Sequence, residues 1–148
     1  MRRIVLCTIV GAFVLGLLGC SQRIGDFTLI STKNVDIGKK FKKVGRKTGE
    51  DSVGEFLFIP FGAPDMKAAV DNAIESADGD LLTNAVVDFK YFSVILFGSR
   101  TIEVTGDVWK LASAGDRGEL YELRRGDDGW ELVSPGGDIR KVDFAALR

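Results

Sequence analysis

The residue with the most distinctive chemistry is Cys20, one of two cysteines in a chain of 148 residues that contains no histidine. A cysteine thiolate is a strong nucleophile, and histidine is the base that most often activates it. Without histidine, a Cys/His catalytic pair is excluded, and zinc, copper and haem lose their commonest ligand. The serines, lysines and carboxylates stand in no G-x-S-x-G, S-x-x-K or phosphate-loop frame. We therefore expect no catalytic residue, no metal, no cofactor and no enzymatic activity.

The segment that precedes Cys20 has the parts of an export signal. Arginines at positions 2 and 3 are followed by an apolar run over 4–18 and then by Gly19, a small residue at the expected cleavage point. The run is short for a membrane span, which needs about 20 apolar residues. Leu17-Leu18-Gly19-Cys20 resembles the lipobox of bacterial lipoproteins. That resemblance implies a diacylglyceryl group on the Cys20 thiol, cleavage after Gly19, and an acyl chain on the new amino group.

A lipidated Cys20 predicts where the protein resides. Two or three acyl chains hold a protein on a bilayer effectively permanently, because each buried methylene contributes roughly 0.8 kcal/mol. Ser21 follows the cysteine, and the resemblance implies sorting to the outer membrane, since Asp at this position is the usual retention signal. We expect a cell-envelope protein anchored on the periplasmic face of the outer membrane. An ordinary cleaved signal and an uncleaved anchor are the alternatives.

Composition limits the rest of the chain. Removal of residues 1–19 takes two of the 20 Lys and Arg and no acid, so 18 basic and 21 acidic residues remain, a formal charge of −3. A nucleic-acid-binding domain is expected to be basic, so nucleic acid is excluded as a partner. The remaining length suits one domain. Cys7 leaves with the signal and Cys20 carries lipid, so the mature chain has no disulfide.

The strongest local charge lies between Lys39 and Lys47. One interpretation is contact with anionic lipid headgroups or a cell-wall polymer, where juxtamembrane lysines contribute roughly 1 kcal/mol each. The other is a solvated loop or an edge strand whose lysines discourage strand pairing, which we favour. The six basic residues are Lys39, Lys40, Lys42, Lys43, Arg46 and Lys47.

Two strands and a helix are predicted next. Phe27–Thr32 is rich in β-branched and apolar residues and suits a first strand, after a lipidated tether over 20–26 that spans at most about 20 Å beyond the cysteine. The segment 51–61 reads as a buried strand ended by Pro60. An apolar stripe then recurs at helical spacing, preceded by Pro64 and Asp65 and followed by Gly79. Its members are Met66, Ala69, Val70, Ala73, Ile74 and Ala77.

The opposite helix face is polar, and Asp78 with Asp80 could ligate calcium. The EF-hand pattern is absent, so Gly79 and Asp80 are better explained as a helix stop followed by a turn.

Two hairpins complete the expected fold. The apolar run 81–97 and the alternating segment 100–108 predict an antiparallel pair with Gly98 and Ser99 between the strands. Gly126-Asp127-Asp128-Gly129 is a turn signature between 119–123 and 130–133. The predicted fold class is therefore α+β, an antiparallel sheet with one main packed helix. Three aromatic residues, Trp109, Tyr121 and Trp130, either form a glycan-binding surface or, as we favour, cover the sheet.

Several segments carry a family resemblance. They are Gly54-Glu55-Phe56-Leu57 with Gly62, the alanines Ala68, Ala69 and Ala73, the segment 80–88, and Val104-Thr105-Gly106-Asp107-Val108. Together with the lipobox, they resemble the TRL-like family of small bacterial lipoproteins over about residues 27–110. The resemblance implies an exported lipoprotein domain with no known enzymatic activity, and it supplies no catalytic residues.

The sequence thus predicts a signal peptide (1–19), a tether (20–26), an α+β domain (27–110) and a C-terminal hairpin extension packed on that domain (111–148). Two functions stay open. The first is a non-enzymatic, lipid-tethered module that binds an envelope protein or the cell wall. The second is a periplasmic lipoprotein that binds, and possibly hydrolyses, a small molecule or glycan. A cleft with convergent carboxylates would favour the second, and a flat surface with an unpaired strand the first.

Overall fold

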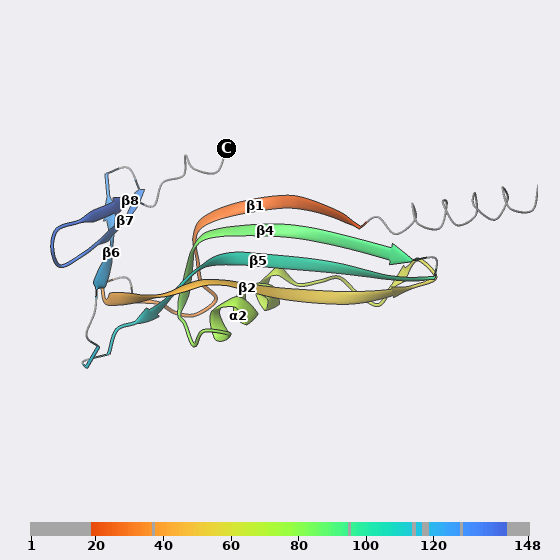
Figure 1. Cartoon of the computed structure of the whole chain (residues 1–148), viewed down its shortest axis with the longest axis horizontal. Helices are drawn as coiled ribbons and strands as arrows, with labels where there is room; N and C mark the ends of the chain where they lie inside the picture. The colour runs from red at the N-terminus through yellow and green to blue at the C-terminus, as the bar shows by residue number, and fades with distance from the viewer. Residues whose placement is uncertain are drawn as a thin grey trace, which may run out of the picture.

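A computed structural model describes residues 19–36, 38–94, 96–113, 115–116, 119–127 and 129–141. Over these residues the chain forms an eight-stranded antiparallel sheet and one helix, which confirms the predicted α+β class (Figure 1). The elements in chain order are β1 (Cys20–Ile30), β2 (Lys40–Phe56), β3 (Ile59–Pro60), α2 (Met66–Glu75), β4 (Leu81–Val94), β5 (Phe97–Leu111), β6 (Leu120–Gly126), β7 (Gly129–Val133) and β8 (Ile139–Lys141).

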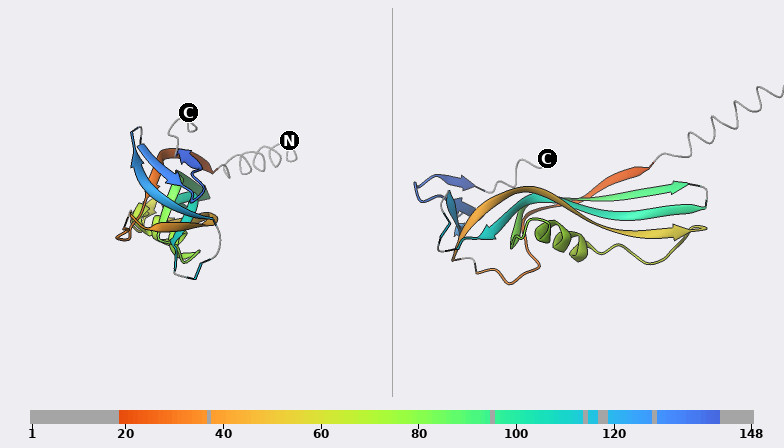
Figure 2. Two further views of the ribbon diagram at one scale, coloured as in Figure 1. Left: turned by 90° about the vertical axis from the view of Figure 1, so that its left-hand side faces the viewer. Right: turned by 60° about the horizontal axis from the view of Figure 1, so that its bottom comes forward.

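Four long strands make most of the sheet, whose order is β1-β4-β5-β2-β6-β7-β8, with β3 paired to β2. β2 follows β5 from Phe41 to Phe56 but meets β6 only at Lys40–Lys42. The strands β6, β7 and β8 therefore gather at one end of an elongated sheet, while β1 begins at the other end (Figures 1 and 2). This long shape separates the two ends of the molecule.

The helix packs on one face of the long strands (Figure 2). The predicted stripe is confirmed at Ala69, Val70, Ala73 and Ile74, which are buried, whereas Met66 is exposed and Ala77 follows the helix and is partly buried. The side chain of Asp65 caps the helix by accepting a hydrogen bond from the Lys67 amide at 2.8 Å. The helix backbone lies directly on β2, because a Cβ added to Gly49 would come within 2.1 Å of the Ala73 nitrogen. The buried members of this core are Ala69, Val70, Ala73, Ile74, Leu82, Ala85, Val87, Val104 and Val108.

A second core lies on the opposite face at the β6–β8 end. Successive strand residues point to opposite faces, so Leu82 and Val108 face the helix while Leu81 and Trp109 face away from it. The Trp109 indole donates a hydrogen bond to Thr83 Oγ1 at 2.9 Å and meets the Tyr121 ring edge-on at 5.5 Å. Packing, the interpretation we favoured for these aromatics, is confirmed for Trp109 and Tyr121. This core comprises Phe41, Leu81, Trp109, Tyr121, Leu123 and Leu132, with Trp130 packed against it.

Both predicted hairpins form, and one of their turns is displaced. Gly126 pairs with Gly129, as the turn signature predicts. In the β4–β5 hairpin, Val94 pairs with Phe97, so Gly98 and Ser99 lie inside β5 rather than in the turn. Gly98 instead allows a close backbone approach inside the strand pair, because a Cβ at position 98 would come within 2.9 Å of the Phe92 carbonyl oxygen.

Two further expectations are wrong. Residues 20–26, expected as a tether, are the first part of β1 and pair with β4 from Tyr91 to Val86. The apolar residues after Glu55, expected in a buried strand, lie on the surface, with Phe58 69% exposed and Ile59 66% exposed, and Leu57 and Phe58 form the turn between β2 and β3. Here β2 extends past α2, so the helix does not cover these side chains.

Candidate functional site

Cys20 is the first residue of β1, and its side chain is exposed. Its strand partner is Tyr91, which pairs in turn with Arg100 of β5, and Arg100 pairs with Val53 of β2. These four positions form one row across the sheet, which we call the Cys20 row. The Cys20 thiol is therefore accessible to solvent in the folded sheet.

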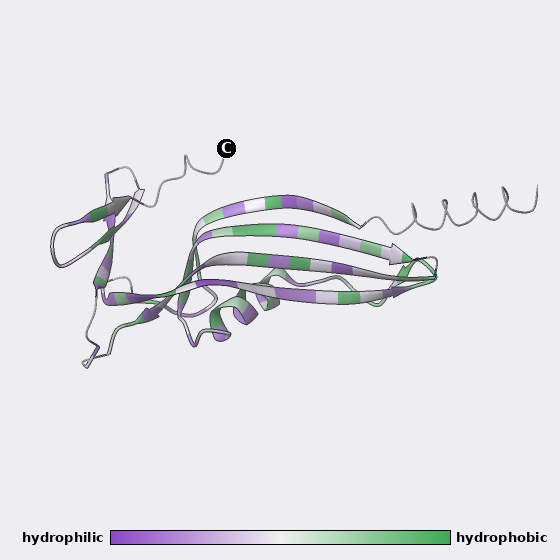
Figure 3. Ribbon diagram, in the orientation of Figure 1, coloured by the Kyte–Doolittle hydropathy of each residue, from purple (hydrophilic) through white to green (hydrophobic). Residues whose placement is uncertain are grey.

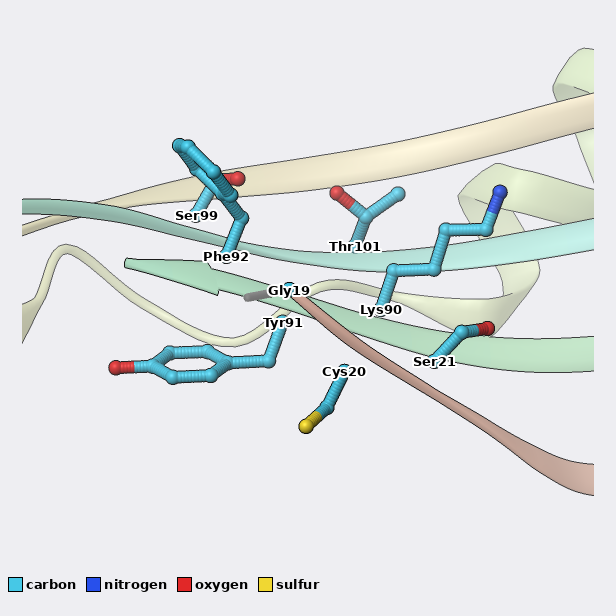
Figure 4. Close-up of a pocket in the computed structure, with 8 residues that line it drawn as sticks. All are labelled: Gly19, Cys20, Ser21, Lys90, Tyr91, Phe92, Ser99 and Thr101. Carbon is cyan, nitrogen blue, oxygen red and sulfur yellow. The ribbon is translucent and has the colours of Figure 1, made fainter. Parts of the chain in front are cut away.

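A shallow depression of about 270 Å³ adjoins Cys20. Figure 4 shows the Cys20 and Tyr91 side chains on one side of the strands and those of Lys90, Phe92 and Thr101 on the other. The depression thus wraps around the free edge of β1 and β4 rather than enclosing a cavity with converging groups. Its lining residues are Gly19, Cys20, Ser21, Lys90, Tyr91, Phe92, Ser99 and Thr101.

An ion pair between a buried carboxylate and a partly exposed guanidinium includes Arg100 of the Cys20 row. The Glu55 side chain is 3% exposed, and its Oε2 accepts a hydrogen bond from Arg100 Nε at 3.0 Å and lies 2.9 Å from Arg100 Nη2. The Tyr91 hydroxyl donates to Glu55 Oε1 at 3.2 Å, and the guanidinium lies 5.9 Å from the Tyr91 ring centroid. A buried carboxylate is stable only when it is paired in this way. The cluster joins β2, β4 and β5 at their ends and leaves no free acid for catalysis.

Beyond the Cys20 row lies a surface that sequence reasoning missed, which we call the apolar tip. It is formed by the β2–β3 turn, the chain that follows β3, and the β4–β5 connection. The Leu57 amide donates to the Leu96 carbonyl at 2.7 Å, and the Phe56 and Phe97 rings are 5.2 Å apart, so the two connections are held together. The apolar tip comprises Phe56, Leu57, Phe58, Ile59, Phe61, Leu96 and Phe97, all of them exposed.

The apolar tip had a sequence signal that we interpreted differently. An uncharged aromatic run over 56–61 is typical of a buried strand, but equally of a surface that meets an apolar partner. Only the second apolar connection, at Leu96 and Phe97, distinguishes the two, because the strand register brings it beside the first. Figure 3 shows hydrophobic colour at the end of β4 and in the connections next to it.

The six basic residues over 39–47 lie toward the opposite end of the sheet. Lys40 pairs with Glu122 of β6, and it lies 13 residues before Val53 on β2, a separation from the Cys20 row of about 40 Å. Lys43 forms an ion pair with Asp107 at 3.0 Å and lies 5.8 Å from the Trp109 ring centroid.

The remaining basic residues divide into two groups. Lys42 lies 3.5 Å from Asp116 and Lys39 lies 3.7 Å from Asp36. Within the described part of the chain, no carboxylate pairs with the other three, which are exposed: Lys40, Arg46 and Lys47. The basic segment therefore offers three free cations along β2, away from Cys20.

The two acids that could have ligated calcium are occupied by other partners. Asp78 forms an ion pair with Lys110, whose hydrogen bond lowers the pKa of the carboxyl. Asp80 Oδ2 accepts a hydrogen bond from the Leu111 amide at 2.7 Å. Over the described residues, no three His, Cys, Asp or Glu side chains are placed to hold a metal ion.

Comparison with known proteins adds no assignment. No family model matches the chain, and neither the search of curated proteins nor the search of solved structures returned a match. The TRL-like resemblance therefore stays a prediction. Among the helices that the structure describes, none has the length and apolar character needed to cross a membrane.

Proposed function

We propose that the protein is a lipid-anchored protein of the bacterial cell envelope that acts as a non-enzymatic interaction module. In this proposal Cys20 carries the diacylglyceryl group and the N-terminal acyl chain, and the outer membrane, facing the periplasm, is the site of anchoring. One observation carries it. The cysteine that ends the apolar run and the small residue is exposed at the extreme start of the folded domain.

The position of Cys20 determines what an anchored domain presents. An attachment point at one end of a long sheet leaves the other end, with β6, β7 and β8, facing away from the anchor (Figure 1). The free cations Lys40, Arg46 and Lys47 lie about 20–40 Å from the Cys20 row along β2. Electrostatic attraction to the headgroups of the anchoring membrane is screened within about 10 Å at 0.1 M salt. An anionic wall polymer or the acidic surface of an envelope protein is therefore the better target for these residues.

Anchoring is tested on the native full-length chain in a bacterium that lipidates proteins. We expect mass spectrometry to find the mature amino terminus at Cys20, with the mass of the lipid groups on its N-terminal peptide. The chain should stay in the membrane fraction after a carbonate wash, whereas Cys20→Ser should lose the lipid. An N-terminal peptide that begins elsewhere, or a Cys20 without lipid, would overturn the anchoring.

Interaction is tested by crosslinking in the same cells, followed by identification of the co-purified partner. The matched variant replaces the three free cations with Gln and keeps Cys20, so it separates loss of the partner from loss of the anchor. We expect the variant to lose the partner while it remains in the membrane. A partner retained in full by the variant would contradict a role for the basic segment, and recovery of a bound glycan or small molecule in place of a partner would favour a ligand-binding lipoprotein.

A further inference from the structure

The apolar tip is unusual because large side chains are exposed together with no core beneath them. Phe58, Phe61 and Phe97 are 69%, 75% and 66% exposed. Single exposed apolar residues are normal on a protein surface, whereas contiguous apolar patches mark places that meet another apolar phase. The apolar tip is therefore a surface with a partner.

The backbone of the β2–β3 turn also points to a function. Leu57 and Phe58 have φ angles of 50° and 64°, in the left-handed region that favours glycine or asparagine. Large apolar residues hold these two positions although they cover no core. The turn displays the side chains outward at a cost to the folded state, as is common where strain serves a function.

The charge pattern defines the kind of partner. The segments 56–64 and 91–99 contain no charged residue. The nearest charges lie in or beside the Cys20 row, where Arg100 pairs with Glu55 and Lys90 pairs with Glu103 at 2.7 Å. An uncharged, Phe-rich end bordered by long cationic side chains is the pattern of a segment that enters the interface of a bilayer. With no charge at its end, it has no means to select a particular headgroup.

The position of Cys20 brings this end to a membrane. The apolar run over 4–18 joins the described structure at Gly19, next to the apolar tip. Cys20 pairs with Tyr91, whereas the outermost row joins Val94, Phe97 and Phe56. Three residues along β4 are about 10 Å, so the apolar tip extends that far beyond the anchored cysteine. Interfacial segments bury their apolar face by about 5–10 Å, which matches this reach.

We propose that the apolar tip inserts into the bilayer that holds the Cys20 lipid, so that the protein contacts the membrane both through its acyl chains and through these side chains. The proposal rests on the anchoring proposed above. A bilayer is favoured over a second copy of the chain because anchoring at the Cys20 row holds the apolar tip at a high effective concentration of lipid. With both the Cys20 lipid and the apolar tip in the bilayer, the long axis of the sheet would point away from the membrane. Attachment through the lipid alone would instead let the whole domain pivot.

The test uses full-length lipidated protein reconstituted into phosphatidylcholine vesicles, with or without bromine on the acyl chains. Phe58→Trp places an indole at the apolar tip, and its signal is the difference from the unsubstituted protein, which has two tryptophans. The matched control is Ile139→Trp, at a residue 48% exposed on β8. If Phe58→Trp folds poorly, Phe61→Trp serves as a second variant, because it also replaces an exposed phenylalanine of the apolar tip with another aromatic residue.

We expect bromolipids to reduce the emission of the added indole at position 58 by about twofold, since quenching requires contact with the acyl region, and to leave the indole at position 139 unchanged. If the protein stays on the vesicles after a carbonate wash but the indole at position 58 is not quenched, insertion of the apolar tip is wrong and the anchoring stands. A blue-shifted but unquenched indole in a dimer would assign the apolar tip to a second copy. Release of every variant by the wash would overturn the anchoring itself.

Discussion

The two ends of the sheet use similar residues in opposite ways. At the β6–β8 end, Phe41, Trp109 and Tyr121 are buried in a core to which β6 and β7 contribute Leu123 and Leu132. At the Cys20 end, the residues of the apolar tip are exposed. The ion pairs differ in the opposite sense: the Glu55 carboxylate at the Cys20 end is buried, whereas the Asp78 carboxylate at the other end is exposed. Burial of an aromatic run is therefore decided by what the chain places over it and not by its composition.

The largest expected effect compares the two ends directly. Leu123→Ala removes buried methyl groups from the second core and should lower the free energy of unfolding by about 2–5 kcal/mol. Phe61→Ala at the apolar tip should change it by less than about 0.5 kcal/mol, because that side chain is already solvated. Urea unfolding of both variants in the full-length Cys20→Ser background measures the difference. Equal losses would mean that the apolar tip contributes to a core.

The buried ion pair provides the next effect. Arg100→Met leaves the Glu55 carboxylate buried with only Tyr91 beside it, so we expect a loss of about 2–3 kcal/mol. Addition of Glu55→Gln to this variant should restore part of the loss, because the uncompensated charge is removed. Lys110→Met, at the exposed pair with Asp78, is the control and should leave the urea midpoint unchanged. A harmless Arg100→Met would contradict the compensating role of the guanidinium.

The strained turn gives a smaller effect of opposite sign. Phe58→Gly should raise the free energy of unfolding by about 0.5–1 kcal/mol, because glycine adopts the positive φ angle without steric cost. The same change removes a large apolar side chain from the apolar tip, so membrane contact should fall while stability rises. Ile59→Gly, at an exposed neighbour for which no positive φ is found, should not stabilise the fold. Stabilisation by both changes would rule out strain as the cause.

The smallest effect is a dependence on pH at exposed pairs. A hydrogen bond from Lys67 lowers the pKa of Asp71, and one from Lys110 lowers that of Asp78. A lowered folded-state pKa contributes stability above the unfolded value of about 3.9, and this is lost as the pH falls through the folded-state pKa. Stability should thus decrease below about pH 4. Asp71→Asn with Asp78→Asn should flatten that part of the profile in chemical unfolding, and an unchanged slope would assign it to other carboxylates.

Local pattern was sufficient for the elements in which chain neighbours determine structure. The buried helix positions from Ala69 to Ile74 and the Asp65 cap were predictable, because helical spacing and capping depend on residues a few positions apart. The turn between Gly126 and Gly129 was predictable for the same reason. The position of the β4–β5 turn was not predictable in this way. Gly98 lies against the backbone of the neighbouring strand rather than in the turn, and a local sequence pattern contains no information about that contact.

The candidate site was predictable only in part. Cys20 was predicted as a candidate site from the short apolar segment before it, and its exposure at the start of β1 fits that prediction. The exposure of the apolar tip was not found, because an uncharged run looks the same whether another element covers it or not. The aromatic residues Trp109 and Tyr121 posed the same ambiguity, and in the structure both are buried as members of the second core.

By itself, the sequence determined the candidate cysteine, the lack of histidine, the helix with its apolar stripe, and the α+β class, because each depends on residue type and short-range spacing. Tertiary structure alone decided that residues 20–26 join the sheet, that the free cations of the basic segment lie about 20–40 Å from the Cys20 row, and that two apolar connections meet near Cys20. These outcomes depend on strand register between residues far apart in the chain. Register sums many weak pairings over the whole sheet, so it exists only once the chain has folded.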